Sequence, residues 1–316
     1  MKVIIPGGSG HLGTSLARAF HGQGHEIVAL SRWARPTPWR TVVWDGETLG
    51  DWTKELDGAD VVINLAGQSV NCRYGRENRR RILDSRVRST RAVGEAIARA
   101  EHPPSTWLQA STATIYAHRY DAPNDETTGI LGGSEPDVPE TWRFSIEVAR
   151  AWESAALEAT LPQTRRVLLR SAIVMSPEEG SPFDLLLWLV RLGLGGKNGD
   201  GRQYISWIHD RDFVRAVRFL MDHPELAGPV NLASPGPQAN AAFLRTLRRA
   251  WGCRLGLPAR RWMLELGAFV LRTETELILK SRRVVPGRLL ASGFHFEFPA
   301  WPAAAADLCQ RIRRVR

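Results

Sequence analysis

The sequence predicts an α/β fold, in which a doubly wound parallel sheet carries a smaller, mainly helical domain on its C-terminal, substrate side. Three observations support this prediction. Apolar strands alternate with helical segments through the first half of the chain, which is typical of a parallel sheet covered on both faces. A glycine-rich turn follows the first strand, and helical patterns dominate beyond residue 175.

The first strand is expected at residues 2–6, and the segment GGSGHLG follows it at residues 7–13. Glycine at positions 7, 10 and 13 lets the backbone leave a buried strand, turn tightly and begin a helix over residues 11–22. The free N–H groups and positive dipole end of such a helix can hold a pyrophosphate. A second apolar run at residues 25–30 completes a strand-helix-strand unit, which indicates a Rossmann-type sheet.

The tip of the second strand distinguishes the two nicotinamide cofactors. An NAD site places an Asp or Glu about twenty residues beyond the glycines, to bind the ribose hydroxyls. This chain has Ser31 and Arg32 there, and a guanidinium group can bind a 2′-phosphate that a carboxylate would repel. The sequence therefore predicts NADP(H) in preference to NAD(H). The alternative is that Arg32 is an ordinary solvated surface arginine.

The remaining elements follow from the same periodicities. Further strands are expected at residues 41–44, 60–65, 106–111, 166–171 and 229–232. Helices are expected at residues 77–101, 142–160, 183–192, 210–222, 240–251, 259–271 and 273–281. Ligands of such sheets bind beyond the carboxyl ends of the strands. The residues at those ends are Gly7, Arg32, Asp45, Ala66 and Ser111.

We expect two domains. Residues 1–175 together with 204–235 form the dinucleotide-binding part, and residues 176–203 together with 236–316 form the substrate-side lid.

The net charge of +9 and the pI of about 10.1 raise the question of nucleic-acid binding. The basic charge is nearly all arginine and is scattered through helices beside acids, and no aromatic platform for single strands is evident. The densest run, at residues 73–81, indicates a solvated helix face, with contact to an anionic substrate or cofactor as the alternative. Nucleic acid is therefore disfavoured as a partner, and an RNA-associated role remains a third alternative that rests on charge alone.

Three cysteines without metal-ligand spacing fit a reducing cytoplasm, and no metal site is expected. No secretory signal is visible, and no apolar run reaches the length of a membrane span. We therefore expect a cytoplasmic protein that does not bind membranes.

Several further segments carry a family resemblance. They are the turn at 7–13, Ser31-Arg32, 64–67, Ser85-Arg86, Arg170-Ser171, 193–196, 199–203, 206–209, 228–231, 279–286 and 289–296. Together they resemble the atypical extended short-chain dehydrogenase/reductase group, the NAD(P)-dependent epimerase-like family with a C-terminal DUF1731 domain, here from about residue 255. Two departures are modest: His11 stands where an aromatic residue is usual, and Tyr74 stands where tryptophan is usual.

The resemblance implies a cofactor site, carried over position by position. Arg32 would bind the 2′-phosphate, Asp45 would approach the adenine, and Arg86 would lie near the nicotinamide half. The full set of implied cofactor residues is Gly7, Ser9, Gly10, His11, Leu12, Ser31, Arg32, Asp45, Leu65, Ala66, Gly67, Arg86, Ala110, Ser111, Arg170 and Ser171.

The catalytic pair of the superfamily is missing. Ordinary members use a tyrosine as acid/base and a lysine four residues later, whose charge lowers the tyrosine pKa. The tyrosines here are Tyr74, Tyr116, Tyr120 and Tyr204, and none has a lysine four residues on. By alignment of the following helix, the pair falls at Phe144 and Val148, and neither side chain can move a proton.

Candidate replacements remain. Thr112 resembles the strand-end hydroxyl that binds substrate, with a backbone-satisfied hydroxyl as the alternative, and Tyr116 is a substitute acid or a packing residue. Arg202, Trp207 and His209 are the candidate substrate contacts.

On the helix that normally carries the acid/base pair, Arg150 and Glu153 lie one turn apart and are expected to pair with each other.

Two functions follow. The first is an NADP(H)-binding oxidoreductase or epimerase-like enzyme with an unidentified small-molecule substrate and an unusual proton donor. The alternative is a non-catalytic NADP(H)-dependent sensor or regulator, motivated by the missing Tyr/Lys pair. The sequence is compatible with a homodimer.

Overall fold

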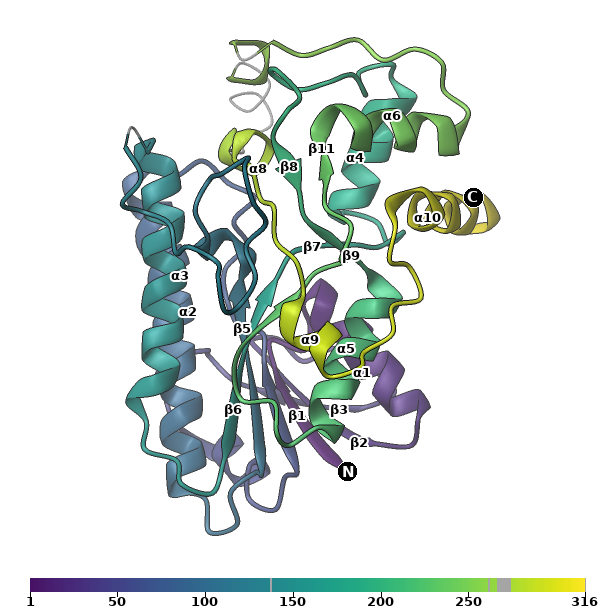
Figure 1. Ribbon diagram of the computed structural model, residues 1–316. Coiled ribbons are helices and arrows are strands. Elements are labelled where there is room, and N and C mark those ends of the chain that lie inside the picture. The colour runs from purple at the N-terminus through teal and green to yellow at the C-terminus, as the bar shows by residue number, and fades with distance from the viewer. Residues whose placement is uncertain (137, 261, 266–273, 316) are drawn as a thin grey trace.

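The computed structural model describes residues 1–136, 138–260, 262–265 and 274–315. A seven-stranded parallel sheet in the order β10-β6-β5-β4-β1-β2-β3 forms its centre (Figure 1). The strands are β1 (Lys2–Pro6), β2 (Glu26–Ser31), β3 (Arg40–Val43), β4 (Val61–Asn64), β5 (Thr106–Thr112), β6 (Arg165–Ser171) and β10 (Gly228–Leu232). The chain winds outward from β1 to β3 and then returns to β4 on the other side of β1. The switch point of the sheet therefore lies between β1 and β4.

Helices cover both faces of the sheet. The first face carries α1 (His11–Gly22) and α5 (Asp210–Asp222), and the second carries α2 (Arg76–Arg99) and α3 (Glu140–Glu158) (Figure 1). Strand β1 shows why both faces are needed, because its side chains alternate between them. Val3 and Ile5 belong to the core that contains Phe20 and Phe213, whereas Ile4 belongs to the core that contains Val93. The predicted doubly wound parallel sheet is thus confirmed.

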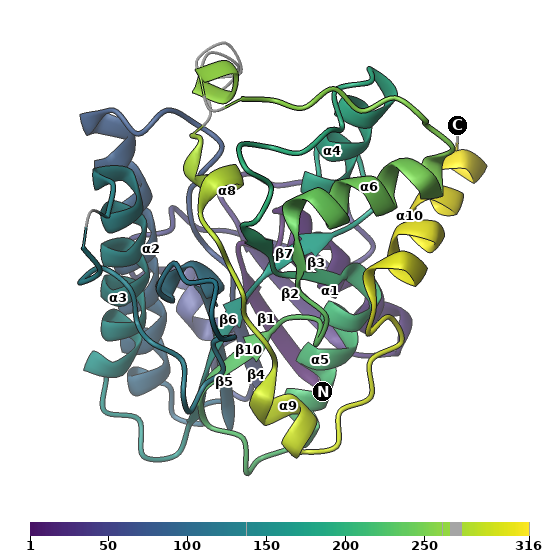
Figure 2. The same ribbon diagram turned by 45° about the horizontal axis from the view of Figure 1, so that its top comes forward.

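The C-terminal side has its own apolar core, in which Phe183, Leu187, Phe243 and Trp301 meet. It is built from α4 (Pro182–Arg191), α6 (Asn240–Trp251) and α10 (Trp301–Val315), and α6 and α10 lie side by side (Figure 2). The short elements are β7 (Ile173–Met175), β8 (Tyr204–Ile205), β9 (Trp207–His209), β11 (Gln238–Ala239), α8 (Glu276–Leu279), α9 (Gly287–Ala291) and the 3₁₀ turns η1 (Asp51–Glu55) and η2 (Ala113–Ile115). Strand β7 pairs with β9, and β8 pairs with β11.

The long predicted elements are present with ends that differ by one or two residues. The two- and three-residue strands were not predicted, because such short pieces have no periodicity of their own. The helix predicted at 273–281 is limited to α8, since the chain becomes extended at Lys280. The helix predicted at 259–271 falls largely outside the described residues, and the division into two domains stays a prediction.

Within the described ranges, no helix combines the length and the apolar character that a membrane crossing needs.

Candidate functional site

A cavity of about 470 Å³ opens at the carboxyl ends of β1, β2 and β4, at the switch point of the sheet. Its wall contains nine residues that the sequence assigns to cofactor binding: Gly7, Ser9, Gly10, Ser31, Arg32, Asp45, Leu65, Ala66 and Gly67. The fold therefore brings the glycine turn, the tip of β2 and the end of β4 to one place.

The glycine turn is shaped by close backbone contacts. Gly7 has a φ of +80°, and a Cβ there would lie 2.8 Å from the carbonyl carbon of Leu65. A Cβ at Gly13 would lie 2.5 Å from the carbonyl oxygen of Gly7, so α1 begins directly against the turn. Gly10 occupies the N-cap position of α1 and has no side chain that could accept a hydrogen bond from the first turn. The N–H groups of that turn are therefore available to an anion.

The tip of β2 presents a free cation. Ser31 donates a hydrogen bond to Ser9 at 2.8 Å, which ties β2 to the glycine turn. Arg32 lines the cavity and has no hydrogen bond or ion pair with any described residue. The other arginines of the wall are already paired with nearby carboxylates, as in the contact of Arg88 with Glu47.

Asp45 lines the cavity beside Arg32 but is occupied by its own turn. Its carboxylate accepts the N–H groups of Glu47 and Thr48 at 2.8 and 2.9 Å, and it also accepts the Thr48 hydroxyl. Partial burial raises the pKa of Asp45, but these hydrogen bonds outweigh it, so the pKa lies below its ordinary value. The carboxylate thus holds the loop that forms this side of the cavity.

His11 and Leu12 are not among the residues that line the cavity. The imidazole Nδ1 of His11 lies 3.0 Å from Glu178, which also accepts a hydrogen bond from Arg18 at 2.9 Å. Glu178 thereby joins the loop before α4 to the start of α1. The other ring nitrogen of His11, Nε2, is buried without a partner in the described structure.

Arg86 lies behind the cavity wall. Its guanidinium donates to the carbonyl oxygens of Gln68 and Ile82, both at 3.0 Å, and its Cζ lies 4.9 Å from the Trp152 ring. Burial lowers the pKa of Arg86 to about 10. A Cβ at Gly67 would lie 3.3 Å from this side chain, so Arg86 supports the end of β4.

The chain matches the model of the NAD dependent epimerase/dehydratase family over residues 3–233, and that of DUF1731, a domain of unknown function, over residues 261–308. It belongs to the NAD-dependent epimerase/dehydratase family. The Bos taurus epimerase family protein SDR39U1 is 32% identical over 98% of this chain and 99% of its own length. The Bacillus subtilis epimerase family protein YfhF is 30% identical over 98% of both chains.

Among solved structures, that of human SDR39U1 (isoform 2) with NADPH has a TM-score of 0.85 and 28% identity. The alignment covers 98% of this chain and 99% of the human one.

In this member of the epimerase/dehydratase family, the remaining predicted cofactor residues lie outside the cavity wall, with Ser111 and Arg170 buried and Ala110 and Ser171 half-buried. Arg170 makes a two-point ion pair with Glu153, and Ser111 donates to the same carboxylate at 2.6 Å. Ala110 and Ser171 flank this cluster at the ends of β5 and β6. The expected pair between Arg150 and Glu153 is wrong.

Arg150 donates instead to the Gly132 carbonyl at 2.7 Å, because Glu153 faces the sheet and Arg150 faces outward.

The two candidate catalytic residues have structural contacts. The hydroxyl of Thr112 accepts the N–H of Thr114 at 3.2 Å, as expected for a strand-end hydroxyl bound by backbone. Tyr116 is 2% exposed, donates to Asn231 at 3.0 Å and accepts from Arg170 at 3.0 Å. Burial raises the pKa of Tyr116 although Arg170 opposes it. A catalytic role for either residue stays a prediction.

The candidate substrate residues differ in exposure. Trp207 and His209 are fully buried and line neither this cavity nor the second one described below. Trp207 donates to the Gly236 carbonyl at 3.2 Å, and Nε2 of His209 lies 3.0 Å from Asp307. Arg202 is exposed, with its guanidinium 5.7 Å from the centre of the Tyr120 ring.

Sequence reasoning missed the polar residues that the C-terminal segment carries to the end of β5. Lys280, which is 2% exposed, donates to the Thr114 carbonyl at 2.8 Å, and Glu276 accepts from Ser145, the neighbour of Phe144. No local signal could have placed residues so far apart in the chain together, because the contact depends on the path of the segment after α8.

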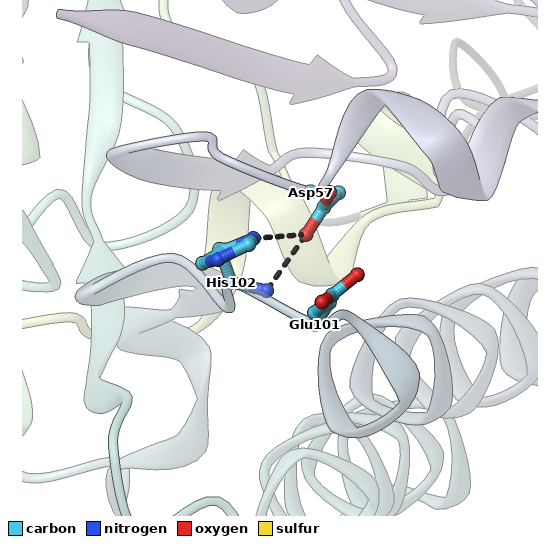
Figure 3. Close-up of side chains that lie close together, drawn as sticks. All are labelled: Asp57, Glu101 and His102. Atoms are coloured by element: carbon cyan, nitrogen blue, oxygen red, sulfur yellow. Dashed lines mark hydrogen bonds and ion pairs between the residues drawn. The ribbon is translucent and has the colours of Figure 1, made fainter.

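At the amino ends of β4 and β5, Asp57, Glu101 and His102 lie within 4.8 Å of one another at the surface (Figure 3). Asp57 accepts the N–H of His102 at 2.7 Å, and the Gly58 N–H donates to the His102 carbonyl. These contacts join the loops that precede β4 and β5, and all three side chains are exposed, so we assign the group a structural role.

Proposed function

We propose that the chain binds NADP(H) in the first cavity. The observation that carries this proposal is Arg32, a cation without a partner among the described residues, at the tip of β2 where NAD sites place a carboxylate. The glycine turn supports it, since the start of α1 offers open N–H groups where a pyrophosphate would lie. The human relative whose structure was solved with NADPH supports it as well.

We further propose an oxidoreductase or epimerase-like reaction on a small molecule that binds on the C-terminal side. The bound cofactor would supply hydride transfer, and the chain would position substrate and exclude water. The chain's own proton transfer cannot follow the usual route, because Phe144 and Val148 stand at the positions of the tyrosine and lysine.

A second candidate is a non-catalytic NADP(H) sensor. The same two positions favour it, because a protein that only reports cofactor occupancy needs no acid/base pair. The burial of Tyr116 also favours the sensor. Tyr116 is the predicted substitute for the missing acid, and its hydroxyl group makes both of its hydrogen bonds within the fold.

The cofactor proposal is tested by tryptophan fluorescence, for which Trp44 in the cavity wall is the reporter. We expect NADPH to bind more tightly than NADH. Arg32→Ala should weaken NADPH roughly 10- to 100-fold and leave NADH unchanged, because only NADPH carries the 2′-phosphate. Arg35→Ala is the matched control and should change neither affinity. Equal affinities for both nucleotides, unaffected by Arg32→Ala, would end the proposal.

The enzyme and the sensor are separated by the absorbance of bound NADPH during addition of aldehydes, ketones and quinones. Oxidation by any of them supports the enzyme. Oxidation by none, together with a protein partner that binds only when NADPH is present, supports the sensor.

A further inference from the structure

A second cavity, of about 940 Å³, lies on the substrate side of the fold. It is open to solvent and is lined by the loop after η2, the start of α3, the loop before β8 and the end of α8, which contribute His118, Trp142, Gln203 and Leu279. Trp142 lies two residues before Phe144, the position of the absent tyrosine. The cavity thus borders the start of α3, the helix that normally carries the acid/base pair, whereas Phe144 itself packs against Tyr74.

His118 is held in one tautomer in the wall of this cavity. The backbone N–H of Ser281 donates to its Nδ1 at 2.7 Å, so the neutral ring carries its proton on Nε2. No described residue makes a hydrogen bond to that Nε2. The ring is half-buried, with its centre 4.7 Å from that of Trp142 and 5.0 Å from that of Tyr120.

The charges around His118 keep the ring neutral. Burial lowers the pKa of His118, and the cations Lys280 and Arg282 of the C-terminal segment lower it further. The carboxylates Glu135 and Asp200, from the loops before α3 and β8, act in the opposite direction but do not outweigh these effects. At neutral pH the side chain is thus an uncharged imidazole that offers one N–H, a form well suited to polarise a carbonyl group.

We propose that the Nε2–H group of His118 binds the carbonyl or hydroxyl oxygen of an uncharged, flat substrate in the second cavity. Trp142 provides an aromatic surface beside the ring for the body of such a molecule. Among the described residues, Glu135, Asp200 and Arg260 are the charged side chains of the wall, and the cations Lys280 and Arg282 act on His118 from behind it, so neither sign of charge dominates and an uncharged substrate fits. This inference rests on the proposed function, since it names the substrate class of that reaction.

The state of His118 is tested by NMR of protein labelled with ¹⁵N-histidine. We expect the Nε2–H tautomer and a titration midpoint below 6.5 for His118. Lys280→Met should raise that midpoint, because it removes a cation, and Glu135→Gln should lower it. A protonated Nδ1, or a midpoint above 6.5 in the unmodified protein, would overturn the proposal.

Ligand recognition is tested with three matched probes: acetophenone, ethylbenzene and benzoate. We expect acetophenone to shift the His118 Nε2 resonance and to bind roughly tenfold more tightly than ethylbenzene, as one hydrogen bond allows, while benzoate binds more weakly than acetophenone. His118→Phe should remove the advantage of acetophenone over ethylbenzene, and His118→Gln, which keeps an N–H donor, should retain part of it. His102→Phe, at the surface, is the control and should have no effect.

An acetophenone affinity unchanged by His118→Phe, or no shift at Nε2, contradicts the proposal. The NADPH affinity is measured separately by fluorescence in each variant. If the unmodified protein binds acetophenone but not NADPH, the proposed function is rejected and the role of His118 is retained. If it binds NADPH but shows no acetophenone binding that depends on His118, only the role of His118 is rejected.

Discussion

Glu153 of α3 and Arg170 of β6 form an ion pair in the interior, in which Nε and Nη2 of the guanidinium each lie 2.8 Å from a carboxylate oxygen. The two side chains are 10% and 8% exposed. Because Ser111 donates to the same carboxylate and Arg170 also donates to Tyr116, the pair fastens α3 to the carboxyl ends of β5 and β6. Helix α3, which also carries Phe144, is thus attached to the carboxyl ends of two central strands of the sheet.

Breaking this pair should be costly. Glu153→Gln leaves a buried guanidinium without its counter-charge, and we expect the free energy of unfolding to fall by about 3–5 kcal/mol in urea titrations. The control is the exposed ion pair between Glu158 of α3 and Arg91 of α2. Glu158→Gln should lower the free energy of unfolding by about 1 kcal/mol or less. Equal losses in the two variants would show that Glu153 is not paired in solution.

Gly13→Ala should damage the glycine turn. The added Cβ would lie 2.5 Å from the Gly7 carbonyl oxygen, so α1 must move away from the turn. We expect a loss of about 1–3 kcal/mol in stability and a clear fall in dinucleotide affinity. Gly22→Ala, in the last turn of α1, meets nothing within 4 Å and should be neutral or stabilising by up to about 1 kcal/mol. Unchanged nucleotide binding by Gly13→Ala would place the pyrophosphate elsewhere.

Lys280 should give the protein a stability that rises with pH. Burial and Arg282 lower its pKa to about 8, although Glu276 and Glu135 oppose them. Between pH 8 and the ordinary lysine pKa near 10.4, the unfolded chain binds more protons than the folded one, so the free energy of unfolding increases with pH, by up to about 3 kcal/mol. Lys280→Met should remove that increase. Parallel profiles for the two proteins would refute the lowered pKa.

Tyr116→Phe separates a structural tyrosine from a catalytic one. The change removes the hydrogen bonds that Tyr116 makes with Oδ1 of Asn231 and Nη1 of Arg170, although both side chains keep their other partners, and we expect a loss of about 1–3 kcal/mol in denaturant titrations. If the residue is structural, NADPH affinity and any turnover persist at temperatures where the variant is folded. A folded variant that binds NADPH normally but has lost turnover would instead identify Tyr116 as the proton donor.

The first cavity was largely predictable, because each of its parts is local in sequence. The glycine turn, the cation at Arg32 and the small residues from Leu65 to Gly67 each follow a strand, and parallel strands bring their carboxyl ends to one edge. The substrate side was not predictable. The burial of Trp207 and His209, and the pairing of Glu153 with Arg170 in place of Arg150, depend on packing between distant segments.

The sequence by itself determined the strand and helix periodicities, the glycine turn and the absence of a Tyr-x-x-x-Lys pair, since these are properties of neighbouring residues. Only the tertiary structure decided that residues 276–282 cross the end of β5, and that Ser281 fixes the tautomer of His118. The physical reason is that side-chain burial and hydrogen-bond partners far apart in the chain are set by how elements pack, and no local pattern encodes that packing.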